Sequence, residues 1–330
     1  MTNVAINGLG RIGRAVLKIV LQTPELNLVA VNDLTPVDNL VYLLRYDSVY
    51  GRFDKTVIAD SNKLIIDSQK IQVMSEKDPL SLPWRELNID IVFECTGAFR
   101  NQDDLIKHLE AGARHVMLSA PAKKGDVASV VYGVNRLPDD DAAVFSTASC
   151  TTNCIAPVAE IMARRIGIKK AIMTTVHAYT SSQGIVDMPH KRIERGRAGA
   201  ANLIPTSTGA ASATTEILPS YSGIFDGIAI RAPVPAGSIA DIIFVTEETT
   251  SADVINDIFR EEKDTDRYRG VLGVSEDPIV SSDIIMDSRA SIVDLTCTRV
   301  VDGDLVKVMS WYDNEWGYAS QMVKQATSLS

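Results

Sequence analysis

A glycine-rich segment near the N-terminus lies between two differently patterned stretches of the chain. Residues 8–13 read Gly-Leu-Gly-Arg-Ile-Gly, follow an apolar run at residues 4–6, and open a stretch at 11–23 with apolar side chains at helical spacing. In a strand–turn–helix unit the three glycines permit a tight turn, close approach of backbone to a pyrophosphate, and close packing of helix on strand. Asp33 ends the next apolar run, 20 residues after Gly13. Together these features predict a dinucleotide-binding βαβ unit.

The first 149 residues alternate short apolar runs with amphipathic stretches. Strand, helix, strand in this order indicates parallel strands joined by right-handed crossovers. We therefore expect a doubly wound parallel-sheet (Rossmann) domain over residues 1–149. The expected strands are 4–6, 26–32, 89–94, 115–118 and 143–146, and the expected helices are 11–23, 37–46 and 101–111.

The pattern changes after residue 149, where long extended segments follow one another with few helices between them. Such a pattern is typical of an α+β domain with a mixed or antiparallel sheet and helices on one side. This second domain is expected over residues 150–314, and a terminal helix within 315–330 is expected to pack back on the first domain. The expected strands are 171–178, 227–232, 239–245 and 305–312, and the expected helices are 154–165, 210–218, 252–261 and 315–326.

Composition narrows the classes of protein to which this chain belongs. Its net charge of -9, from 33 basic and 42 acidic residues, disfavours binding to the phosphate backbone of nucleic acid. Its longest apolar runs have the length of strands, so no membrane span is expected, and the N-terminus lacks the pattern of a secretory signal. Four cysteines in 330 residues do not form a disulfide framework, which favours a cytoplasmic protein.

Asp33 also predicts which dinucleotide binds. A carboxylate accepts hydrogen bonds from the ribose hydroxyls of NAD, whereas it repels the 2′-phosphate of NADP. At an effective dielectric constant near 20, two like charges about 4 Å apart repel by roughly 4 kcal/mol before screening by salt. The next residues, Leu34, Thr35 and Pro36, bring no arginine to relieve this repulsion, so NAD is the expected cofactor.

Cys150 is the candidate nucleophile. It follows an expected strand and precedes an expected helix, with Ser149 as a suitable N-cap residue. A thiol in the first turn of a helix lies at the positive end of the helix dipole, which favours the thiolate. His177, at the end of an expected strand, is the histidine best placed to act as its acid–base partner.

The other cysteines are interpreted as packing residues. No sequence motif gives a chemical role to Cys95, Cys154 or Cys297, and Cys154 falls one helical turn after Cys150. The short spacing between Cys150 and Cys154 has no second Cys or His pair to complete four zinc ligands, so no metal site is expected.

Several motifs, taken together, resemble one enzyme family. They match in order from end to end the phosphorylating glyceraldehyde-3-phosphate dehydrogenase family, and the cysteine and Trp-Tyr-Asp-Asn-Glu motifs are highly specific to it and its closest relatives. The motifs are residues 4–13 with Asn32-Asp33, Ser-Cys-Thr-Thr-Asn-Cys at 149–154, Val-His-Ala-Tyr-Thr at 176–180, Pro-Thr-Ser-Thr-Gly-Ala at 205–210 and Trp-Tyr-Asp-Asn-Glu-Trp-Gly-Tyr at 311–318.

The resemblance implies an NAD-dependent oxidation in glycolysis or gluconeogenesis. In that family a thiolate attacks glyceraldehyde 3-phosphate to give a hemithioacetal, hydride passes to the nicotinamide, and inorganic phosphate attacks the resulting thioester to release 1,3-bisphosphoglycerate. Cys150 matches the nucleophile, His177 the base, and Asn314 the residue that orients the nicotinamide carboxamide. The family's long loop after His177 crosses to a neighbouring subunit, which implies a homotetramer.

The resemblance also assigns ligands for the cofactor and for two phosphate groups. A local basic cluster at residues 190–197, unusual in this acidic chain, independently favours an anion site. The cofactor residues are Gly8, Gly10, Gly13 and Asp33 from the motif, joined by Arg11, Ile12, Lys77, Thr96, Ser119 and Asn314 from the resemblance. The attacking phosphate matches Ser149, Thr151, Arg195, Thr208 and Gly209, and the substrate phosphate matches Thr180, Ser182 and Arg231.

The chain departs from the family pattern near the phosphate sites. Glu194 stands where Arg is usual, which places a negative charge beside the cluster, and Ser212 stands where Lys is common. Two alternatives therefore stay open. One is an erythrose-4-phosphate dehydrogenase, whose acyl-enzyme is hydrolysed by water, and the other is a non-catalytic protein that uses a Rossmann fold for binding.

Overall fold

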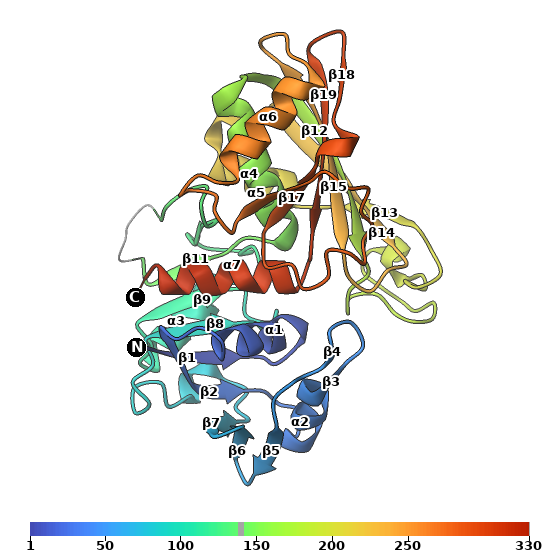
Figure 1. Cartoon of the computed structure of the whole chain (residues 1–330). Coiled ribbons are helices and arrows are strands. Elements are labelled where there is room, and N and C mark those ends of the chain that lie inside the picture. The colour runs from blue at the N-terminus through green and yellow to red at the C-terminus, as the bar shows by residue number, and fades with distance from the viewer. Residues whose placement is uncertain (138–141, 330) are drawn as a thin grey trace. The chain divides into compact units, whose positions relative to one another are not determined.

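The structure is a computed structural model that describes residues 1–137 and 142–329. The chain forms two compact units, each containing a large sheet (Figure 1). Unit 1 comprises Met1–Val130, Arg136–Ala148 and Met322–Ser330, and unit 2 comprises Val131–Asn135 and Ser149–Gln321.

The nine-stranded sheet of unit 1 has the order β10-β11-β9-β8-β1-β2-β7-β6-β5. All neighbours from β10 to β7 pair in parallel, and β5, β6 and β7 form an antiparallel meander at one edge. The strand order reverses at β1, which makes the carboxyl ends of β1 and its neighbours the expected ligand site. The strands are β1 Thr2–Asn7, β2 Leu26–Asn32, β5 Val57–Asp60, β6 Lys63–Ile66, β7 Gln69–Met74, β8 Ile91–Glu94, β9 His115–Leu118, β10 Ala128–Ser129 and β11 Val144–Ser146.

Helices connect the parallel strands of unit 1, as the sequence pattern predicts. α1 (Arg11–Val20) buries Val16 and Val20 and ends three residues earlier than expected, because the chain turns there before β2. α2 (Val37–Arg45) ends where Tyr46 begins a small two-stranded sheet. The remaining elements of the unit are β3 Tyr46–Asp47, β4 Gly51–Arg52, η1 Pro79–Ser81 and α3 Gln102–Glu110.

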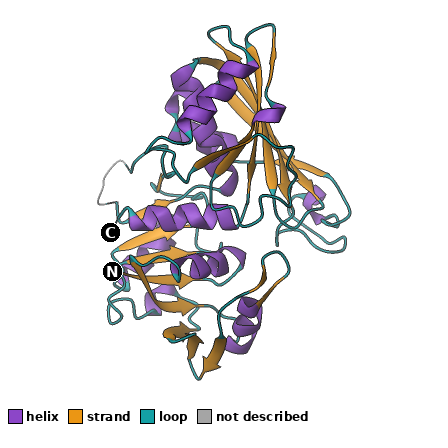
Figure 2. Ribbon diagram, in the orientation of Figure 1, coloured by secondary structure: helices purple, strands orange, loops and turns teal. Residues whose placement is uncertain are grey.

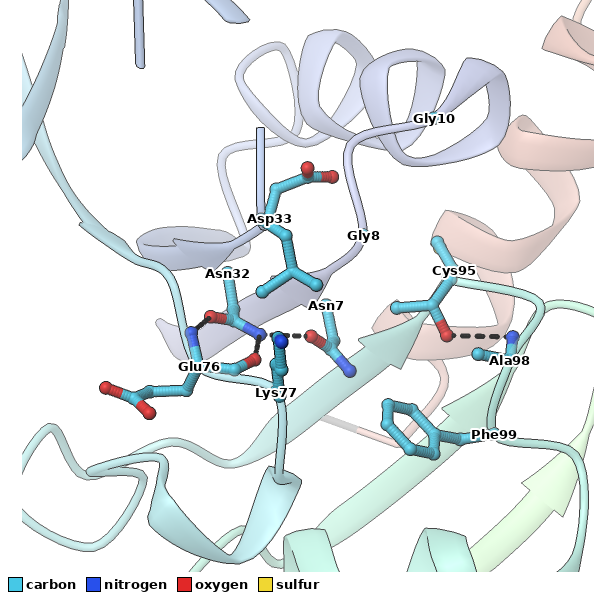
Figure 3. Close-up of a pocket in the computed structure, with 12 residues that line it drawn as sticks. Asn7, Gly8, Gly10, Asn32, Asp33, Glu76, Lys77, Cys95, Ala98 and Phe99 are labelled. Carbon is cyan, nitrogen blue, oxygen red and sulfur yellow. Dashed lines mark hydrogen bonds between the residues drawn. The ribbon is translucent and has the colours of Figure 1, made fainter. Parts of the chain in front are cut away.

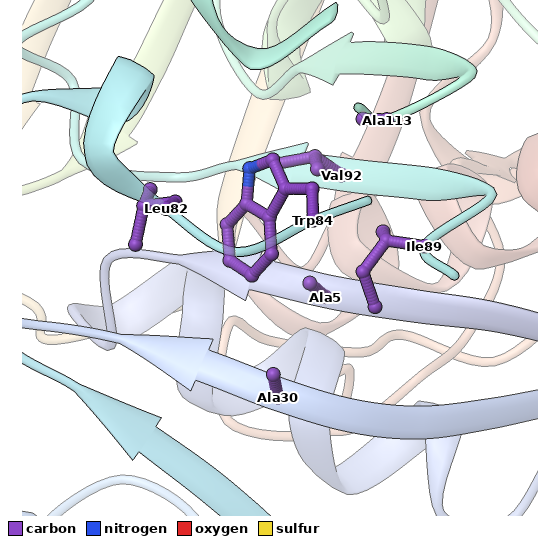
Figure 4. Packing of buried hydrophobic residues seen from close by; sticks show 7 residues of the cluster. All are labelled: Ala5, Ala30, Leu82, Trp84, Ile89, Val92 and Ala113. Carbon is purple, nitrogen blue, oxygen red and sulfur yellow. The ribbon is translucent and has the colours of Figure 1, made fainter. Parts of the chain in front are cut away.

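An indole side chain fills the core on one face of this sheet (Figure 4). Trp84 is fully buried against Ala5 of β1 and Ala30 of β2, whose small side chains leave room for the ring. Its Nε1 donates to Nδ1 of buried His108 at 2.9 Å, so the polar atom of the indole is satisfied inside the core.

The sheet of unit 2 is mixed and has the order β13-β14-β12-β15-β19-β17-β16, with β18 paired to β19. β12 pairs in parallel with β14 and antiparallel with β15, whose long ladder continues to β19. The strands are β12 Ile168–Ala178, β13 Ile204–Ser207, β14 Phe225–Ala232, β15 Ser238–Thr246, β16 Leu272–Ser275, β17 Ser291–Asp294, β18 Arg299–Val301 and β19 Leu305–Tyr312.

Helices gather on one side of the long strands of unit 2 (Figure 2). The central one, α4, is buried along most of its length, and the opposite face of the sheet leaves Ile172 and Ile228 more than half exposed. The predicted fold class, a Rossmann domain with an α+β domain, is confirmed. The helices of unit 2 are α4 Cys150–Arg165, η2 Ile193–Gly196, α5 Ala210–Ile217, η3 Pro219–Tyr221, α6 Ala252–Glu262 and η4 Leu295–Cys297. The last helix, α7 Trp316–Thr327, begins in unit 2 and ends in unit 1.

The close contact of α1 with the preceding turn gives a testable prediction. A Cβ on Gly13 would lie 1.9 Å from the carbonyl oxygen of Gly8, whereas a Cβ on Gly10 would meet nothing within 4 Å. Gly13→Ala should therefore lower the free energy of unfolding by about 1–3 kcal/mol, although alanine is the better helix former. Thermal or urea unfolding measures the change. Gly10→Ala is the control, and equal stability of the two variants would contradict the packing role of Gly13.

Candidate functional site

The glycine-rich turn connects β1 to α1 through a backbone conformation that suits glycine. Gly8 has φ +92°, and a Cβ there would lie 2.7 Å from the backbone nitrogen of Thr96. The Gly8 N–H donates to the carbonyl of Asn32 at 2.7 Å, which ties the turn to the end of β2. Gly10 is the N-cap residue of α1 and has no side chain to cap the helix. The first turn of α1 is therefore accessible to an anionic group.

A pocket opens at the carboxyl ends of the central strands of unit 1 (Figure 3). This is the switch point of the sheet, where a doubly wound fold binds nucleotides. Five predicted cofactor residues line it, namely Gly8, Gly10, Asp33, Lys77 and Thr96. Gly13, Arg11, Ile12 and Ser119 belong to unit 1 but do not line it, and Asn314 belongs to unit 2. The pocket is completed by Asn7, Asn32, Leu34, Glu76, Cys95, Ala98 and Phe99.

Both oxygens of the Asp33 carboxylate accept hydrogen bonds from backbone N–H groups. One oxygen accepts from Leu9 N–H at 2.6 Å and the other from Thr35 N–H at 2.8 Å. The first of these bonds joins the end of β2 to the glycine-rich turn. Asp33 therefore fixes the glycine-rich turn and presents a negative charge to the pocket. The predicted preference for NAD over NADP depends on this charge.

A buried polar network lies under the pocket, and the sequence did not reveal it. The Glu94 carboxylate is fully buried, accepts from Asn7 Nδ2 at 2.6 Å and from Thr96 N–H at 2.8 Å, and contacts His108 Nε2 at 3.2 Å. Asn7 Oδ1 in turn accepts from Asn32 Nδ2 at 2.7 Å. These bonds fix three residues of the pocket lining. Their signal in the sequence is weak, since a lone Glu after an apolar strand has many possible partners.

The residues that line the pocket suit a dinucleotide. The Cβ position of Gly10 faces open space, so the backbone is bare where a pyrophosphate would approach. Lys77 supplies a positive charge, and Asp33 supplies an acceptor for ribose hydroxyls. No group of three His, Cys, Asp or Glu side chains that could hold a metal ion occurs among the residues that the structure describes.

Cys150 is the first residue of α4 in unit 2. Ser149 caps the helix, because its Oγ accepts from Thr152 N–H at 3.1 Å. Cys154, predicted to be a packing residue, is fully buried one turn later, with its Sγ 3.6 Å from the carbonyl oxygen of Ser310. All four cysteines of the chain are free.

The structure brings Cys150 and His177 together. Cys150 Sγ lies 3.4 Å from His177 Nε2, at the carboxyl end of β12. His177 Nδ1 lies 2.6 Å from the carbonyl oxygen of Ala178, and a proton on Nδ1 that donates to this oxygen leaves the Nε2 lone pair facing the thiol. In that tautomer the imidazole can accept the thiol proton.

Burial disfavours a charge on either partner alone. It raises the pKa of the Cys150 thiol, against the opposing effect of Arg231, and burial together with the positive charge of Arg231 lowers the pKa of His177 to about 3. Transfer of the proton from Sγ to Nε2 avoids an isolated charge, because it creates two opposite charges in contact. The arrangement therefore suits a thiolate formed by transfer within the pair.

Tyr312 adds a hydroxyl network beside this pair. Its buried hydroxyl lies 2.9 Å from Thr151 Oγ1 and 2.8 Å from Thr175 Oγ1, and its ring packs edge-on against the imidazole of His177. The predicted phosphate ligand Thr151 thus directs its hydroxyl to Tyr312 in this structure. Thr175 of β12 was not singled out from the sequence, because its contact with Tyr312 of β19 depends on the strand register.

Arg231 lies next to His177 because the two are partners in the parallel ladder between β12 and β14. Its Nη1 donates to the Ala178 carbonyl at 2.9 Å and lies 2.6 Å from His177 Nδ1, which accepts from Arg231 only in the tautomer whose proton is on Nε2. Arg231 Nε is buried without a partner among the described residues, which leaves a donor for a ligand. The hydroxyls of Thr180 and Ser182 lie 2.9 Å apart on the segment that follows β12. These two residues and Arg231 were predicted to bind the phosphate of the substrate.

Arg195 lies on η2 and is oriented by groups of β13. Its Nε donates to Thr206 Oγ1 at 2.9 Å, and its Nη2 donates to the Ser207 carbonyl at 3.0 Å. Thr208 Oγ1 accepts from Ala210 N–H at 3.1 Å, at the start of α5. Gly209 presents bare backbone there, since a Cβ would meet nothing within 4 Å. A guanidinium and the start of a helix are both suitable groups for an anion.

Asn314 is fixed through its carbonyl oxygen. Its Oδ1 accepts from Gly237 N–H at 3.2 Å and from Ser238 Oγ at 3.1 Å, and Ser238 Oγ also accepts from Ala178 N–H. The side-chain NH₂ group of Asn314 donates to none of the described residues. The NH₂ group of Asn314 is therefore available to donate a hydrogen bond to a ligand. The resemblance implies that this ligand is the nicotinamide carboxamide.

Comparisons with known proteins agree with this geometry. A family model described as the NAD binding domain of glyceraldehyde 3-phosphate dehydrogenase matches residues 2–102, and one described as its C-terminal domain matches 149–314. The glyceraldehyde-3-phosphate dehydrogenase of Zymomonas mobilis is 46% identical over 99% of this chain and 98% of its own length. The glyceraldehyde-3-phosphate dehydrogenase 1 of Bacillus subtilis is 45% identical and the enzyme of Geobacillus stearothermophilus is 44% identical, each over 99% of this chain and 98% of its own.

The position of Asp33 predicts the cofactor preference of a variant. Asp33→Asn keeps an acceptor oxygen but removes the charge, so the ratio of kcat/KM for NADP to that for NAD should rise by about tenfold or more. Steady-state kinetics with both cofactors measures this ratio. Glu76→Gln is the matched control, because it also removes a carboxylate from the pocket lining, and that carboxylate points away from Asp33 in Figure 3. An unchanged ratio in Asp33→Asn would refute the repulsion argument.

The contact between Cys150 and His177 predicts how thiol reactivity depends on pH. In His177→Asn the thiolate must form without its proton acceptor, so the midpoint of alkylation of Cys150 by iodoacetamide should move upward by about 1–3 pH units. The rate of modification measured against pH gives the midpoint. His190→Asn, which changes a partly exposed histidine, should behave like the unaltered protein. Superimposable profiles for the unaltered protein and His177→Asn would show that the pair does not share a proton.

Proposed function

This chain belongs to the glyceraldehyde-3-phosphate dehydrogenase family, and we propose that Cys150 and His177 carry out its NAD-dependent oxidation with inorganic phosphate as acyl acceptor. The resemblance seen in the sequence and the predicted cofactor, NAD, are confirmed. The observation that carries the proposal is the 3.4 Å contact of Cys150 Sγ with His177 Nε2 at the start of α4.

The first chemical step requires these two side chains. His177 Nε2 accepts the thiol proton while Cys150 Sγ forms a bond to the aldehyde carbon of glyceraldehyde 3-phosphate. The protonated imidazole then stabilises the developing alkoxide, and the product of this step is a hemithioacetal. The hydroxyl proton of this species returns to His177 as its carbon is oxidised, so one residue serves as both acid and base.

Bound NAD supplies the acceptor for the hydride that leaves the hemithioacetal carbon. Gly8, Gly10, Asp33, Lys77 and Thr96 would hold the adenosine and pyrophosphate part, since they line the pocket of unit 1. The free NH₂ group of Asn314 would hold the nicotinamide carboxamide. Arg11, Ile12, Gly13 and Ser119 are proposed to support the same site from the surrounding turn and strand.

The second half of the reaction needs two phosphate sites. Arg231, with Thr180 and Ser182, would bind the phosphate of the substrate, because its buried Nε lacks a partner among the described residues. Arg195, with Thr208 and Gly209, would bind the attacking phosphate. A phosphate oxygen attacks the thioester carbon, the Cys150 thiolate leaves, and the product is an acyl phosphate. Ser149 and Thr151 are proposed as further hydroxyl contacts at the start of α4.

We also propose a homotetramer in the cytoplasm. The loop after His177 exposes large apolar side chains, with Ile185 exposed by 88%, Ile193 by 84% and Val186 by 72%. Apolar side chains gathered on one exposed loop favour contact with a second copy of the chain. Four free cysteines fit a reducing compartment, and no described helix is long and apolar enough to cross a membrane.

A steady-state assay with glyceraldehyde 3-phosphate and NAD, with and without inorganic phosphate, tests the proposed reaction. We expect NADH formation to depend on phosphate and the product to be an acyl phosphate, detected as its hydroxamate after treatment with hydroxylamine. A free acid formed at the same rate without phosphate would instead indicate hydrolysis by water, as in erythrose-4-phosphate dehydrogenase.

Replacement of the nucleophile separates catalysis from cofactor binding. Cys150→Ser should lower kcat by at least about a thousandfold, because a serine hydroxyl is a far weaker nucleophile than a thiolate at neutral pH. The Kd for NAD should stay within about twofold, since Cys150 does not line the pocket of unit 1. Cys154→Ser is the matched control one turn along the same helix. Activity that persists in Cys150→Ser would refute the assignment.

A further inference from the structure

Two consecutive residues of η2 converge on one hydroxyl of β13. Thr206 Oγ1 donates to Glu194 Oε1 at 2.7 Å and accepts from Arg195 Nε at 2.9 Å. Thr206 is 8% exposed, and its backbone is fixed opposite Ala229 of β14. The hydroxyl is therefore a rigid junction between an acidic and a basic side chain.

The direction of each hydrogen bond follows from the number of protons. A carboxylate has none to offer, so the single hydroxyl proton of Thr206 points to Glu194, and the Thr206 oxygen receives the Nε–H of Arg195. The Thr206 hydrogen bond keeps the pKa of Glu194 below its usual range, so the carboxylate is ionised at neutral pH. Glu194 thereby fixes the rotamer of the hydroxyl that anchors Arg195.

This anchoring determines which edge of the guanidinium faces away from the protein. Arg195 uses Nε–H for Thr206 and one Nη2–H for the Ser207 carbonyl, and its remaining N–H groups meet no acceptor among the described residues. Arg195 is near enough to the reacting pair for its charge to contribute to the lowered pKa of His177. The exposed edge is therefore the part that can bind an anion beside the catalytic centre.

We propose that Glu194 is a positioning residue that sets the affinity for the attacking phosphate by orienting Arg195 through Thr206. This inference rests on the proposed role of Arg195 as a ligand of that phosphate. The carboxylate has two opposing effects, since its hydrogen bond orients the guanidinium and its negative charge weakens attraction for the anion. Variants that separate acceptor from charge distinguish these effects.

Glu194→Gln and Glu194→Ala provide that separation. The amide oxygen of Gln still accepts from Thr206 and the negative charge is gone, so KM for phosphate should equal that of the unaltered enzyme or fall by up to about threefold. Ala removes the acceptor as well, frees the Thr206 hydroxyl to rotate, and should raise KM for phosphate by about tenfold over Glu194→Gln. KM for glyceraldehyde 3-phosphate and for NAD should stay within about twofold in both, which a general loss of structure would not allow.

Substitutions at Thr206 test the same path from its other end. Thr206→Val keeps the shape of the side chain but loses the hydroxyl, and should raise KM for phosphate about as much as Glu194→Ala does. The double variant Glu194→Ala/Thr206→Val should be no worse than either single change, because both break one path. Thr206→Ser restores the hydroxyl and should restore the KM.

Asp187→Asn is the matched control for charge on the same loop. Asp187 pairs with Arg197 at 2.8 Å and does not contact Arg195, so its change should leave KM for phosphate within about twofold. A Glu194→Ala enzyme whose KM for phosphate equals or falls below that of Glu194→Gln would overturn this inference and leave the proposed phosphate acceptor unaffected. If the unaltered enzyme showed no phosphate dependence, the proposed acceptor and this inference would both be overturned.

Discussion

The proposed chemistry of this protein depends on a sulfur and an imidazole held in contact among buried polar groups. Cys150 is fixed because it begins α4, and His177 is fixed because it is the penultimate residue of β12, which is bonded on both sides in the sheet. Neither group is stabilised as an isolated charge at that depth. Transfer of a proton from Sγ to Nε2 avoids an isolated charge, because it leaves two opposite charges in contact. Arg231 and Arg195 are proposed to bind the negatively charged phosphate groups of the substrates.

The two units bring different constraints to the reaction. In unit 1 the backbone of the glycine-rich turn and the side chains of Asp33 and Lys77 line the pocket, and buried Glu94 fixes the Asn7 side chain and the Thr96 backbone N–H. In unit 2 the proposed chemistry depends on Cys150 at the start of α4 and on side chains near the ends of β12, β14 and β19, whose positions follow from strand register. Arg231 illustrates this dependence, because it is the partner of His177 in the parallel ladder.

Local features of the sequence predicted much of this arrangement. The glycine spacing with Asp33 predicted the pocket of unit 1, and the Ser149-Cys150 sequence predicted a helix start capped by Ser149, because each depends on neighbours in the chain. The antiparallel strands at residues 57–74, the contact of Glu94 with His108 and the hydroxyl network of Tyr312 were not predicted. They depend on partners brought together by the fold, and no local pattern marks which distant residue will be adjacent.

The most direct test of the central claim is mass spectrometry of the enzyme after a single turnover without phosphate. The protein would be mixed with glyceraldehyde 3-phosphate and NAD, quenched in acid, and digested for peptide mapping. We expect a phosphoglyceroyl group on the peptide containing Cys150, and we expect it to disappear when phosphate is added before the quench. NADH formed in the first turnover with Cys150 unmodified, or an acyl group on another residue, would contradict the central claim.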